Sequence, residues 1–501
     1  MELDIVCVCV WHTDRDAVVA TAQVIFRKVV GVLRRPDYFF VLIAAILGFV
    51  VLALVPPLQV PDEIGHFSRA YALSELNFRQ DNLSTGSGAH LPTAIGQFEE
   101  MVSRDNLPNL YTAKYTPDTA RRAMAIRVTP ERTDRMFVNL AAYSPVAYVP
   151  QATGIAVARL FTSRIGVMFY AARICNLLFF VGLCYAAIRL IPVGKWLIAA
   201  VLVSPMVVFL AGSLSADVSV FVYTTLLIAI TMYLWTRTPP QIQTRWWVIL
   251  GIVACVLALS KQAYIVFVPF VALLLVRRTK QFRWRTSQLY ASRILPVLLV
   301  FLSVVVAYIG WTYVNQSTDA DTSLIQRANG FAVNPEEQLR KVTSDPLYAV
   351  STVASTAVGQ ASDETFQSMF GSFGRLNVNL PMWAIGMYVV VLLLFVGYVS
   401  QANASLLVQQ RTLALIIAGV LVAVCSLGIF VSLLLVWTPV GAESVAGIQG
   451  RYFIPCLLLL APGVVGVYRH TLRLRYLILP MTIVHLSMCI LLIDRYYGFF
   501  T

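Results

Sequence analysis

The feature that most constrains this chain is an uninterrupted apolar run, residues 38–55, that leads directly into prolines and then into two acids. At about 1.5 Å per residue, a helix over this run can cross a bilayer core of roughly 30 Å. Prolines end such a helix, and Pro61 can open the next one because the first helical residue needs no N–H partner. The sequence therefore predicts that Asp62 and Glu63 lie where a membrane helix ends.

A second helix is predicted over residues 62–73. Helical spacing groups Asp62, His66, Arg69 and Leu73 on one face, and Ile64, Phe67 and Tyr71 on the other. This pattern predicts an amphipathic helix along the membrane surface, with a carboxylate, an imidazole and a guanidinium turned toward the space that the protein encloses. The helix macrodipole alone also favours an acid in the first turn, by about 0.3 to 1 kcal/mol, so position by itself does not identify a site.

Composition decides the class of protein. The 501 residues are 58% hydrophobic and 13% charged, and the mean hydropathy is +0.74. A water-soluble core of this size cannot use so much apolar surface, so we predict an all-α polytopic membrane protein. The net charge of +13 is better explained by Lys and Arg in cytoplasmic loops than by nucleic-acid binding, which we do not expect.

Basic clusters set the predicted orientation, because Lys and Arg collect on the cytoplasmic side. Residues 1–37 form a cytoplasmic segment, and residues 38–501 form one multi-span membrane domain with extracytoplasmic loops at 56–164 and 315–380. About eleven spans are predicted from apolar length and charge. They are 38–55, 165–190, 196–211, 218–235, 246–259, 265–276, 294–314, 381–398, 412–437, 452–468 and 476–493.

Two segments leave alternatives. Residues 143–161 contain two prolines and Arg159, so they favour an interfacial or re-entrant helix, although a full span stays open. Residues 246–276 could form one long helix with Lys261 at mid-membrane. That arrangement would reverse every later segment and place the basic stretch 277–293 outside, so we predict that the chain turns back at Lys261.

With this topology, the polar residues near membrane depth fall mostly on the extracytoplasmic side. They are Asp62, Asp217, Lys261, Arg375, Gln449 and Arg451. A charge at a helix centre costs about 2.5 to 3.5 kcal/mol, so charges at such depth tend to mark functional cavities. Lys261 and Arg451 could instead extend to the outer headgroups, but two cations and two acids on one side favour a site.

Other kinds of site have less support in the sequence. Asp62, Glu63 and His66 could hold a divalent metal, but three neighbouring candidates are weak grounds, so a metal is possible but not indicated. The sequence has no phosphate-cradling glycine loop and no nucleophile elbow. ATP-driven transport by this chain alone is therefore not expected.

Six short motifs are distributed along the chain. They are Pro61-Asp62-Glu63-Ile64-Gly65-His66-Phe67-Ser68-Arg69-Ala70-Tyr71, Tyr143-Ser144-Pro145, Ser213-Leu214-Ser215-Ala216-Asp217, Lys261-Gln262-Ala263-Tyr264, Gly371-Ser372-Phe373-Gly374 and Gly447-Ile448-Gln449-Gly450-Arg451-Tyr452-Phe453-Ile454-Pro455. In this order they resemble the motifs of a bacterial membrane family catalogued as domain of unknown function 2142, and the resemblance covers most of residues 38–495. The layout of that family in turn resembles the C-type (GT-C) glycosyltransferases. Those enzymes carry an acid at the outer end of the first helix and amphipathic helices in the first outer loop, and their donor is a sugar linked to a lipid phosphate.

The resemblance implies an enzyme of the bacterial plasma membrane, and the orientation predicted from charge places its N-terminus in the cytoplasm and its active site outside. It would transfer a sugar from a polyprenyl-phosphate-linked donor to an envelope glycan or lipid acceptor, with inversion at the anomeric carbon. Asp62 matches the position of the general base, with Glu63 as its substitute. A departing phosphate needs cations, which bind it by charge-assisted hydrogen bonds. The further candidates are Arg69, Lys261 and Arg451 for the lipid phosphate, and His66, Asp217 and Gln449 for positioning the acceptor or donor sugar.

Two other functions stay open at this stage. One is a flippase or exporter for a lipid-linked cell-surface polysaccharide, and the other is a non-catalytic subunit of an envelope assembly complex. The two long outer loops favour the enzyme, because a transporter is expected to carry polar residues at mid-membrane and often an internal repeat.

Overall fold

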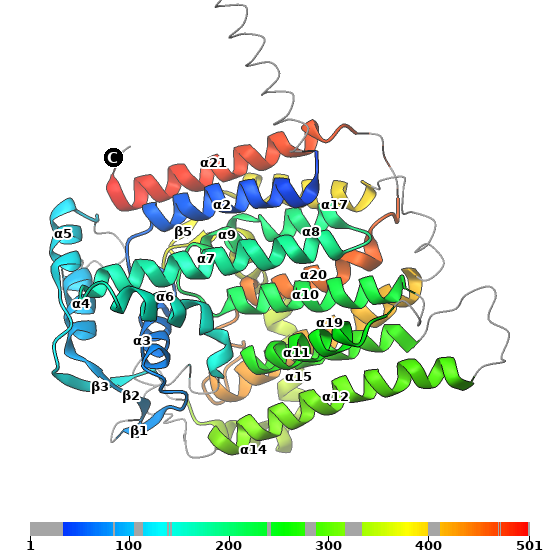
Figure 1. The fold of residues 1–501 in the computed structure, drawn as a ribbon, viewed down its shortest axis with the longest axis horizontal. Helices are drawn as coiled ribbons and strands as arrows, with labels where there is room; N and C mark the ends of the chain where they lie inside the picture. The colour runs from blue at the N-terminus through cyan, green and yellow to red at the C-terminus, as the bar shows by residue number, and fades with distance from the viewer. Residues whose placement is uncertain are drawn as a thin grey trace, which may run out of the picture.

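The computed structural model describes residues 34–83, 86–104, 114–137, 140, 143–237, 242–275, 287–315, 333–398, 411–468, 470 and 472–498. Its long helices lie side by side as a bundle, and they run across the view in Figure 1. The elements between α2 and α6 gather at the left-hand end of that view. We call this end the site end, and the other end of the bundle the far end.

Six helices in the described part of the chain are long and apolar enough to cross a membrane. They are α2 (Pro36–Leu54), α7 (Ile165–Leu190), α10 (Asp217–Trp235), α12 (Ser287–Asn315), α19 (Arg411–Val436) and α21 (Arg475–Tyr497). Each corresponds to a predicted span, with ends that differ by a few residues. The chain is therefore a polytopic membrane protein by the length and composition of its helices.

The other predicted spans form shorter or interrupted helices. They are α8 (Lys195–Leu202) with α9 (Pro205–Ala211), α11 (Thr244–Ser260), η4 (Gln262–Leu275), α17 (Met382–Gly397), and η6 (Gly450–Phe453) with α20 (Ile454–Val464). The predicted span 196–211 breaks before Pro205, which lacks the N–H that would continue the helix. The 3-10 segment η4 has 14 residues and, at about 2.0 Å per residue, is nearly as long as a bilayer core is thick. Six spans are thus supported by length, rather than eleven.

The chain turns back at Lys261, as the charge distribution predicts. Helix α11 ends at Ser260, and Lys261 is extended, with φ −147° and ψ 123°. The segment η4 then packs against both α11 and α10. The single long helix over 246–276 therefore does not form.

The first loop folds into a small domain with its own core at the site end. Its elements are α3 (Glu63–Ser74), β1 (Asp81–Leu83), β2 (Gly86–Pro92), α4 (Thr93–Arg104), α5 (Pro117–Ala125), β3 (Arg132–Met136), η2 (Pro145–Ala147) and α6 (Val149–Arg159). The strands form an antiparallel sheet in the order β1-β2-β3, with Leu91 opposite Thr133. The all-α prediction is wrong in this detail. The segment 143–161 gives α6, which at 11 residues is too short to span a bilayer.

The prediction that residues 62–73 lie along the membrane surface is also wrong. Helix α3 is buried on both faces: Phe67 and Arg69, on opposite sides, are each 0% exposed. It packs against α6 and β2, and Phe67 contacts the rings of Phe98 and Phe169. The sheet and the neighbouring helices of the loop cover the face that the sequence assigns to the membrane.

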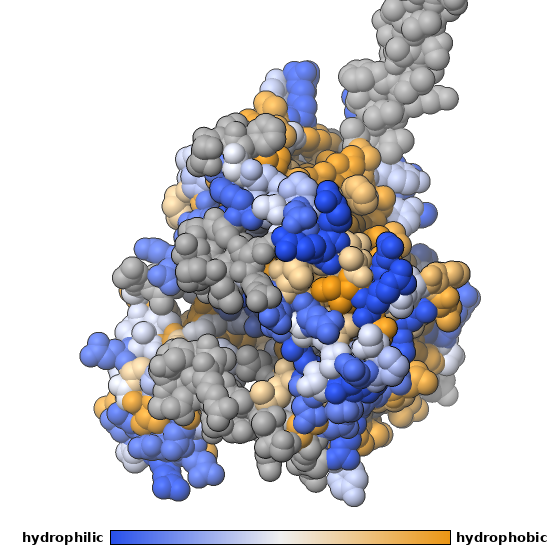
Figure 2. All heavy atoms as spheres, turned by 90° about the vertical axis from the view of Figure 1, so that its left-hand side faces the viewer, coloured by the Kyte–Doolittle hydropathy of each residue, from blue (hydrophilic) through white to orange (hydrophobic). Residues whose placement is uncertain are grey.

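The second loop also folds at the site end. It contains α14 (Pro335–Ser344), α15 (Pro346–Val358), α16 (Gln360–Phe370) and a two-stranded sheet of β4 (Ser372–Phe373) and β5 (Val378–Asn379). Helix α16 packs against η6. Figure 2 views the molecule from the site end, where hydrophilic side chains form much of the coloured surface.

Candidate functional site

A buried arginine in a membrane helix fixes the loop that carries Asp62. Arg173 lies on α7 and is 0% exposed. Its Nε and Nη2 donate to the two carboxylate oxygens of Glu63 at 2.9 and 2.8 Å. Its Nη1 and Nη2 also donate to the backbone carbonyls of Val55 and Pro56, at 2.7 and 3.2 Å. One side chain therefore holds both ends of the segment between α2 and α3.

The next turn of α7 fixes a second loop beside the first. The amide nitrogen of Asn176 donates to the carbonyl of Ser213 at 2.8 Å, and the backbone N–H of Leu214 donates to Glu63 at 3.1 Å. Gln151 of α6 donates to the side-chain oxygen of Asn176 at 2.9 Å. The loop before α10 is therefore held against the loop after α2, which brings Asp217 toward Asp62.

Asp62 has an unusual backbone conformation. Its φ of 61° and ψ of 9° place it in the left-handed region, and its side chain does not cap α3. Asp and Asn tolerate this region better than most residues, although the conformation still costs of order 1 kcal/mol. Leu58 in the same loop has a φ of 64°, and its carbonyl accepts hydrogen bonds from Arg375 Nε and Nη2 at 3.1 and 3.0 Å. Contacts from two sides hold this loop in its strained form.

Two acids and two cations meet at the site end. Arg451 Nη2 lies 3.5 Å from an oxygen of Asp62, and Arg451 Nε lies 3.4 Å from an oxygen of Asp217. Lys261 forms an ion pair with Asp217. The side chains of Lys261, Asp217 and Arg451 are only 13%, 6% and 4% exposed, whereas that of Asp62 is 49% exposed. The four residues, which we call the ion cluster, are therefore open at Asp62.

Aromatic rings enclose the cations of the ion cluster. Lys261 Nζ lies 5.4 Å from the ring centre of Tyr143 and 5.2 Å from that of Tyr452. Arg451 Cζ is 5.5 Å from the Tyr452 ring, and Tyr264 donates to the Tyr452 carbonyl at 2.9 Å. Cations over ring faces gain about 0.5 to 2 kcal/mol. The rings keep the cations in place while restricting their hydration.

The second loop sets the position of Arg451. The N–H of Gly450 donates to Ser368 of α16 at 2.7 Å. A Cβ on Gly450 would lie 1.9 Å from the Thr365 carbonyl oxygen and 2.2 Å from the Met369 nitrogen. Only glycine permits this contact between η6 and α16, so Arg451 reaches the ion cluster because the residue before it has no side chain.

His66 lies beside the ion cluster in a buried position. Its Nδ1 is 2.9 Å from the hydroxyl of Tyr148. Burial lowers the pKa of His66 to about 4, and the charges of Asp62 and Lys261 act on it in opposite directions. His66 is therefore neutral near pH 7, with one ring nitrogen able to accept a hydrogen bond.

The structure separates Glu63 and Arg69 from the ion cluster. Glu63 is saturated by Arg173 and Leu214, and Arg69 donates to the carbonyls of Asn77 and Phe78. Asp62, Glu63 and His66 thus do not converge, and the described residues contain no group of three or more His, Cys, Asp or Glu side chains that could hold a metal.

Gln449 directly precedes Gly450 and lies two residues before Arg451 in the chain. Its side-chain oxygen is buried and has no hydrogen-bond partner among the described residues. Arg451 Nε is also buried without a hydrogen bond there, because its 3.4 Å contact with Asp217 is an ion pair only. Buried polar atoms without a protein partner commonly bind water or a polar ligand.

Arg173 and Asn176 are not among the site residues predicted from the sequence. They could have been found because they are a charge and an amide inside an otherwise apolar run. Such residues in a membrane segment face the protein interior and find partners there. Their spacing of three residues puts both on one face of α7. Both residues position the site and do not line it.

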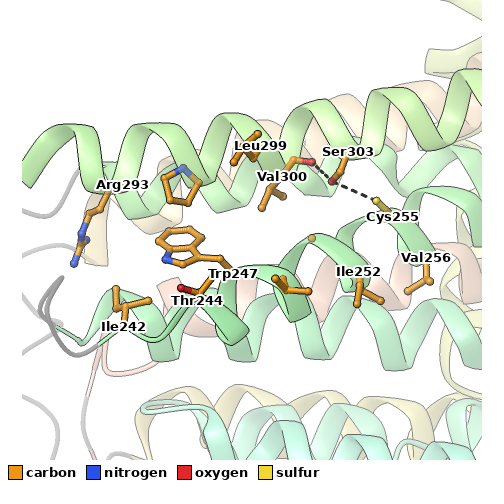
Figure 3. A pocket seen from close by; sticks show the side chains of 13 residues that line it. Ile242, Thr244, Trp247, Ile252, Cys255, Val256, Arg293, Leu299, Val300 and Ser303 are labelled. Carbon is orange, nitrogen blue, oxygen red and sulfur yellow. Dashed lines mark hydrogen bonds between the residues drawn. The ribbon is translucent and has the colours of Figure 1, made fainter.

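An apolar cavity of about 690 Å³ lies elsewhere, between α11 and α12 (Figure 3). Trp247 and Pro296 line it, Arg293 stands at one end, and Cys255 donates to Ser303 at 3.5 Å near the other. No residue of the ion cluster lines this cavity. This cavity is therefore separate from the polar residues that the sequence singles out.

Comparison with known proteins gives one finding. No curated protein and no solved structure matches the chain significantly. The sequence profile of a family described as "Predicted membrane protein (DUF2142)" matches residues 45–460, which include Asp62, Asp217, Lys261 and Arg451. This range is well over half of the chain, so the protein belongs to the DUF2142 family of predicted membrane proteins.

Proposed function

We propose that the protein is an inverting membrane glycosyltransferase that uses a polyprenyl-phosphate-linked sugar. The acceptor would be an envelope glycan or lipid outside the bacterial plasma membrane. The observation that carries this proposal is the ion cluster, in which one carboxylate is open and two cations lie behind it. A sugar phosphate donor needs this combination: a base for the acceptor hydroxyl and positive charge for the departing phosphate.

Asp62 acts as the general base in this proposal. It is the most exposed member of the ion cluster, and Arg451 Nη2 lies 3.5 Å from its carboxylate. It takes the proton of the acceptor hydroxyl while the oxygen attacks the anomeric carbon and the bond to the phosphate oxygen breaks. Glu63 is not a substitute, because its carboxylate is 0% exposed and fully paired with Arg173.

Lys261 and Arg451 bind the lipid phosphate. Both are now balanced by acids, so the cluster is electrically neutral before the donor arrives. The donor phosphate can replace one of these acids as the partner of a cation. Arg451 Nε, which has no hydrogen-bond partner among the described residues, can donate to it. The departing phosphate is a stable anion, so the reaction needs no strong general acid.

The neutral residues of the site position the sugars. His66 can accept a hydrogen bond from a sugar hydroxyl because its pKa is low, and the buried oxygen of Gln449 is a second acceptor.

Asp217 orients the two cations, since both are paired with it.

Substitution of Asp62 by Asn tests the proposal. Asn tolerates the left-handed backbone as well as Asp does, so the fold and donor binding should be kept. Loss of a positioned base lowers rates by about 10² to 10⁴-fold, so Asp62→Asn should lose nearly all sugar transfer in a purified assay. Asp118→Asn is the matched control, because Asp118 is an exposed acid on α5 at the same end of the molecule.

The outcomes separate three functions. A fully active Asp62→Asn enzyme would rule out Asp62 as the base. Normal transfer in vitro, together with slow appearance of the glycan outside the cell, would favour the flippase or exporter. An absence of transfer by the wild-type protein with any lipid-linked sugar would favour the non-catalytic subunit.

The orientation is tested separately by labelling with an impermeant thiol reagent. Arg121 on α5 lies at the site end and its side chain is 79% exposed, whereas Arg473 is exposed between α20 and α21 at the far end. In whole cells, Arg121→Cys should be labelled and Arg473→Cys should not. The reverse pattern would place the ion cluster in the cytoplasm.

A further inference from the structure

A second charged cavity lies at the far end of the bundle. It has a volume of about 270 Å³. The start of α2, the turn between α7 and α8, and the ends of α17 and α20 form it. Its charged lining residues are Arg34, Arg35 and Lys195, with Trp196 and Tyr398 among the walls. Nothing in the glycosyltransferase proposal uses this cavity.

Positive charge dominates the cavity. Arg35 pairs with Asp37 at 2.8 Å. The three basic residues of the lining therefore outnumber this acid. Lys195 donates to the carbonyl of Arg189 at 2.8 Å, so the end of α7 fixes its position. Arg34 is exposed and Arg35 is 54% exposed. The cations are therefore open to a ligand that enters from the water or from the headgroup layer.

Helix α8 begins at the same cavity. Its N-terminal cap is Gly194, with a φ of 80° and no side-chain hydrogen bond to the helix. A Cβ there would lie 3.2 Å from a side-chain carbon of Val465, and the positive φ is the conformation that favours glycine. The first N–H groups of a helix have no partner within the helix, and the dipole makes that end attractive to anions. An anion in the cavity would meet the cations and this helix end together.

Contacts between aromatic rings position one wall of the cavity. Trp196 is stacked on Phe395 at 5.9 Å and packs edge-on against Tyr398 at 6.2 Å. Phe39 of α2 also contacts the Trp196 ring, with the ring centres 5.3 Å apart. These contacts fix Trp196 without a ligand, which lowers the cost of ordering this wall on binding.

We propose that this cavity binds the phosphate headgroup of an anionic phospholipid. The adjacent surface of α2 selects a lipid over a soluble phosphate. Leu42, Ile46 and Phe49 are 40%, 52% and 61% exposed, and they continue the helical face on which Arg35 stands. An acyl chain can lie on this apolar stripe while the headgroup occupies the cavity, as in other basic pockets between membrane helices.

The bound lipid joins the far ends of two elements that lead to the site. Helix α2 runs from the cavity to the Asp62 loop, and α20 runs from Arg451 to the cavity. The lipid therefore stabilises the relative positions of these helices, independently of any reaction at the ion cluster.

The experiment uses the full-length protein in detergent, with phosphatidylglycerol, phosphatidylcholine or inorganic phosphate added at equal phosphate concentration. Phosphatidylglycerol should raise the Tm of the wild-type protein by about 2 to 4 °C above phosphatidylcholine. The double variant Arg34→Gln/Lys195→Gln should lose most of that shift while keeping the wild-type Tm in phosphatidylcholine. Native mass spectrometry should show one fewer retained phosphatidylglycerol per protein.

Arg473→Gln is the matched control, because it removes an exposed cation at the same end that does not line the cavity. It should keep the full shift. If the double variant does not fold, Arg34→Gln alone carries the test, since Arg34 is exposed. An undiminished shift in the folded variant, or an equal loss in Arg473→Gln, would overturn the site. An equal shift with inorganic phosphate would overturn the lipid as its ligand.

Discussion

Asp62 and Glu63 are neighbours in the chain, and each pairs with an arginine, yet their surroundings are opposite. Glu63 and Arg173 are both 0% exposed, and their nitrogens and oxygens are joined by hydrogen bonds of 2.8 and 2.9 Å. Asp62 is 49% exposed, and its contact with Arg451 is 3.5 Å long. The first pair is sealed and saturated, whereas the second is open and loosely held.

The sealed pair is suited to supporting the fold, whereas the open pair is suited to binding a ligand. A sealed pair cannot exchange its partners without unfolding its surroundings, because a charge left alone in the interior costs several kcal/mol. An open pair can exchange one partner for a ligand. The sharp backbone turn at Asp62, with its positive φ, is what sends two adjacent carboxylates to these two environments.

The largest expected effect is on the sealed pair. Arg173→Ala leaves the Glu63 carboxylate buried and unpaired, which costs about 3 to 5 kcal/mol. We expect a large loss of folded protein and a lower Tm in detergent. The double variant Arg173→Met/Glu63→Gln should recover part of the loss, since it leaves no buried charge.

Arg189→Ala is the matched control, because Arg189 lies at the exposed end of the same helix. It should remain close to wild type. A stable Arg173→Ala protein that has lost only activity would remove the contrast and place the sealed pair in the active site.

The membrane class, the turn at Lys261 and the ion cluster could be predicted from the sequence. Apolar length identifies spans directly, and the cost of a charge in lipid makes Asp217, Lys261 and Arg451 conspicuous. The predicted topology then places these residues at helix ends on one side of the membrane, and this step requires no prediction of how the helices pack. The structure brings Asp217, Lys261 and Arg451 together with Asp62 for that reason.

The environments of Glu63 and Arg69 could not be predicted. Both depend on tertiary contacts: one on a helix far along the chain, the other on the carbonyls of a turn. Helical periodicity also places Arg69 on the same face as Asp62, but the positive φ at Asp62 breaks that register before the helix begins. The sheet of the first loop was missed because its strands are short and β2 contains two glycines and a proline.

An intermediate effect, on the KM for the lipid donor, is expected at Lys261. It tests whether the cations of the ion cluster bind a ligand. In the proposed reaction Lys261 binds the donor phosphate, so Lys261→Ala would remove a charge-assisted hydrogen bond worth about 1.5 to 3 kcal/mol. The KM for the lipid donor should rise by about 10 to 100-fold, and Lys261→Arg should be milder. Steady-state kinetics over a range of donor concentrations measure this directly.

The control for Lys261 is the neutral double variant Lys261→Ala/Asp217→Asn. If Lys261 binds phosphate, the double variant should keep the raised KM, because the ligand is still missing. If donor affinity returns to wild type, Lys261 serves only to neutralise Asp217. The Lys261–Asp217 pair would then have a structural role, like the sealed pair of Glu63 and Arg173.

The smallest expected effect concerns His66, which stands beside the open cluster. Its folded-state pKa is lowered to about 4 by burial, against an ordinary value of 6.5. As the pH falls below 6.5 the unfolded chain binds this proton first, so stability is lost between those two values and is fully present above them. Between about pH 7.5 and pH 5.5 the loss should be of order 1 kcal/mol, or roughly 1 to 2 °C in Tm. His66→Gln cannot titrate, so its Tm should fall less than that of the wild type over the same range. If the Tm of the two proteins changes equally with pH, His66 is hydrated or already paired with a carboxylate. The ion cluster would then extend further into the protein than its exposed edge at Asp62.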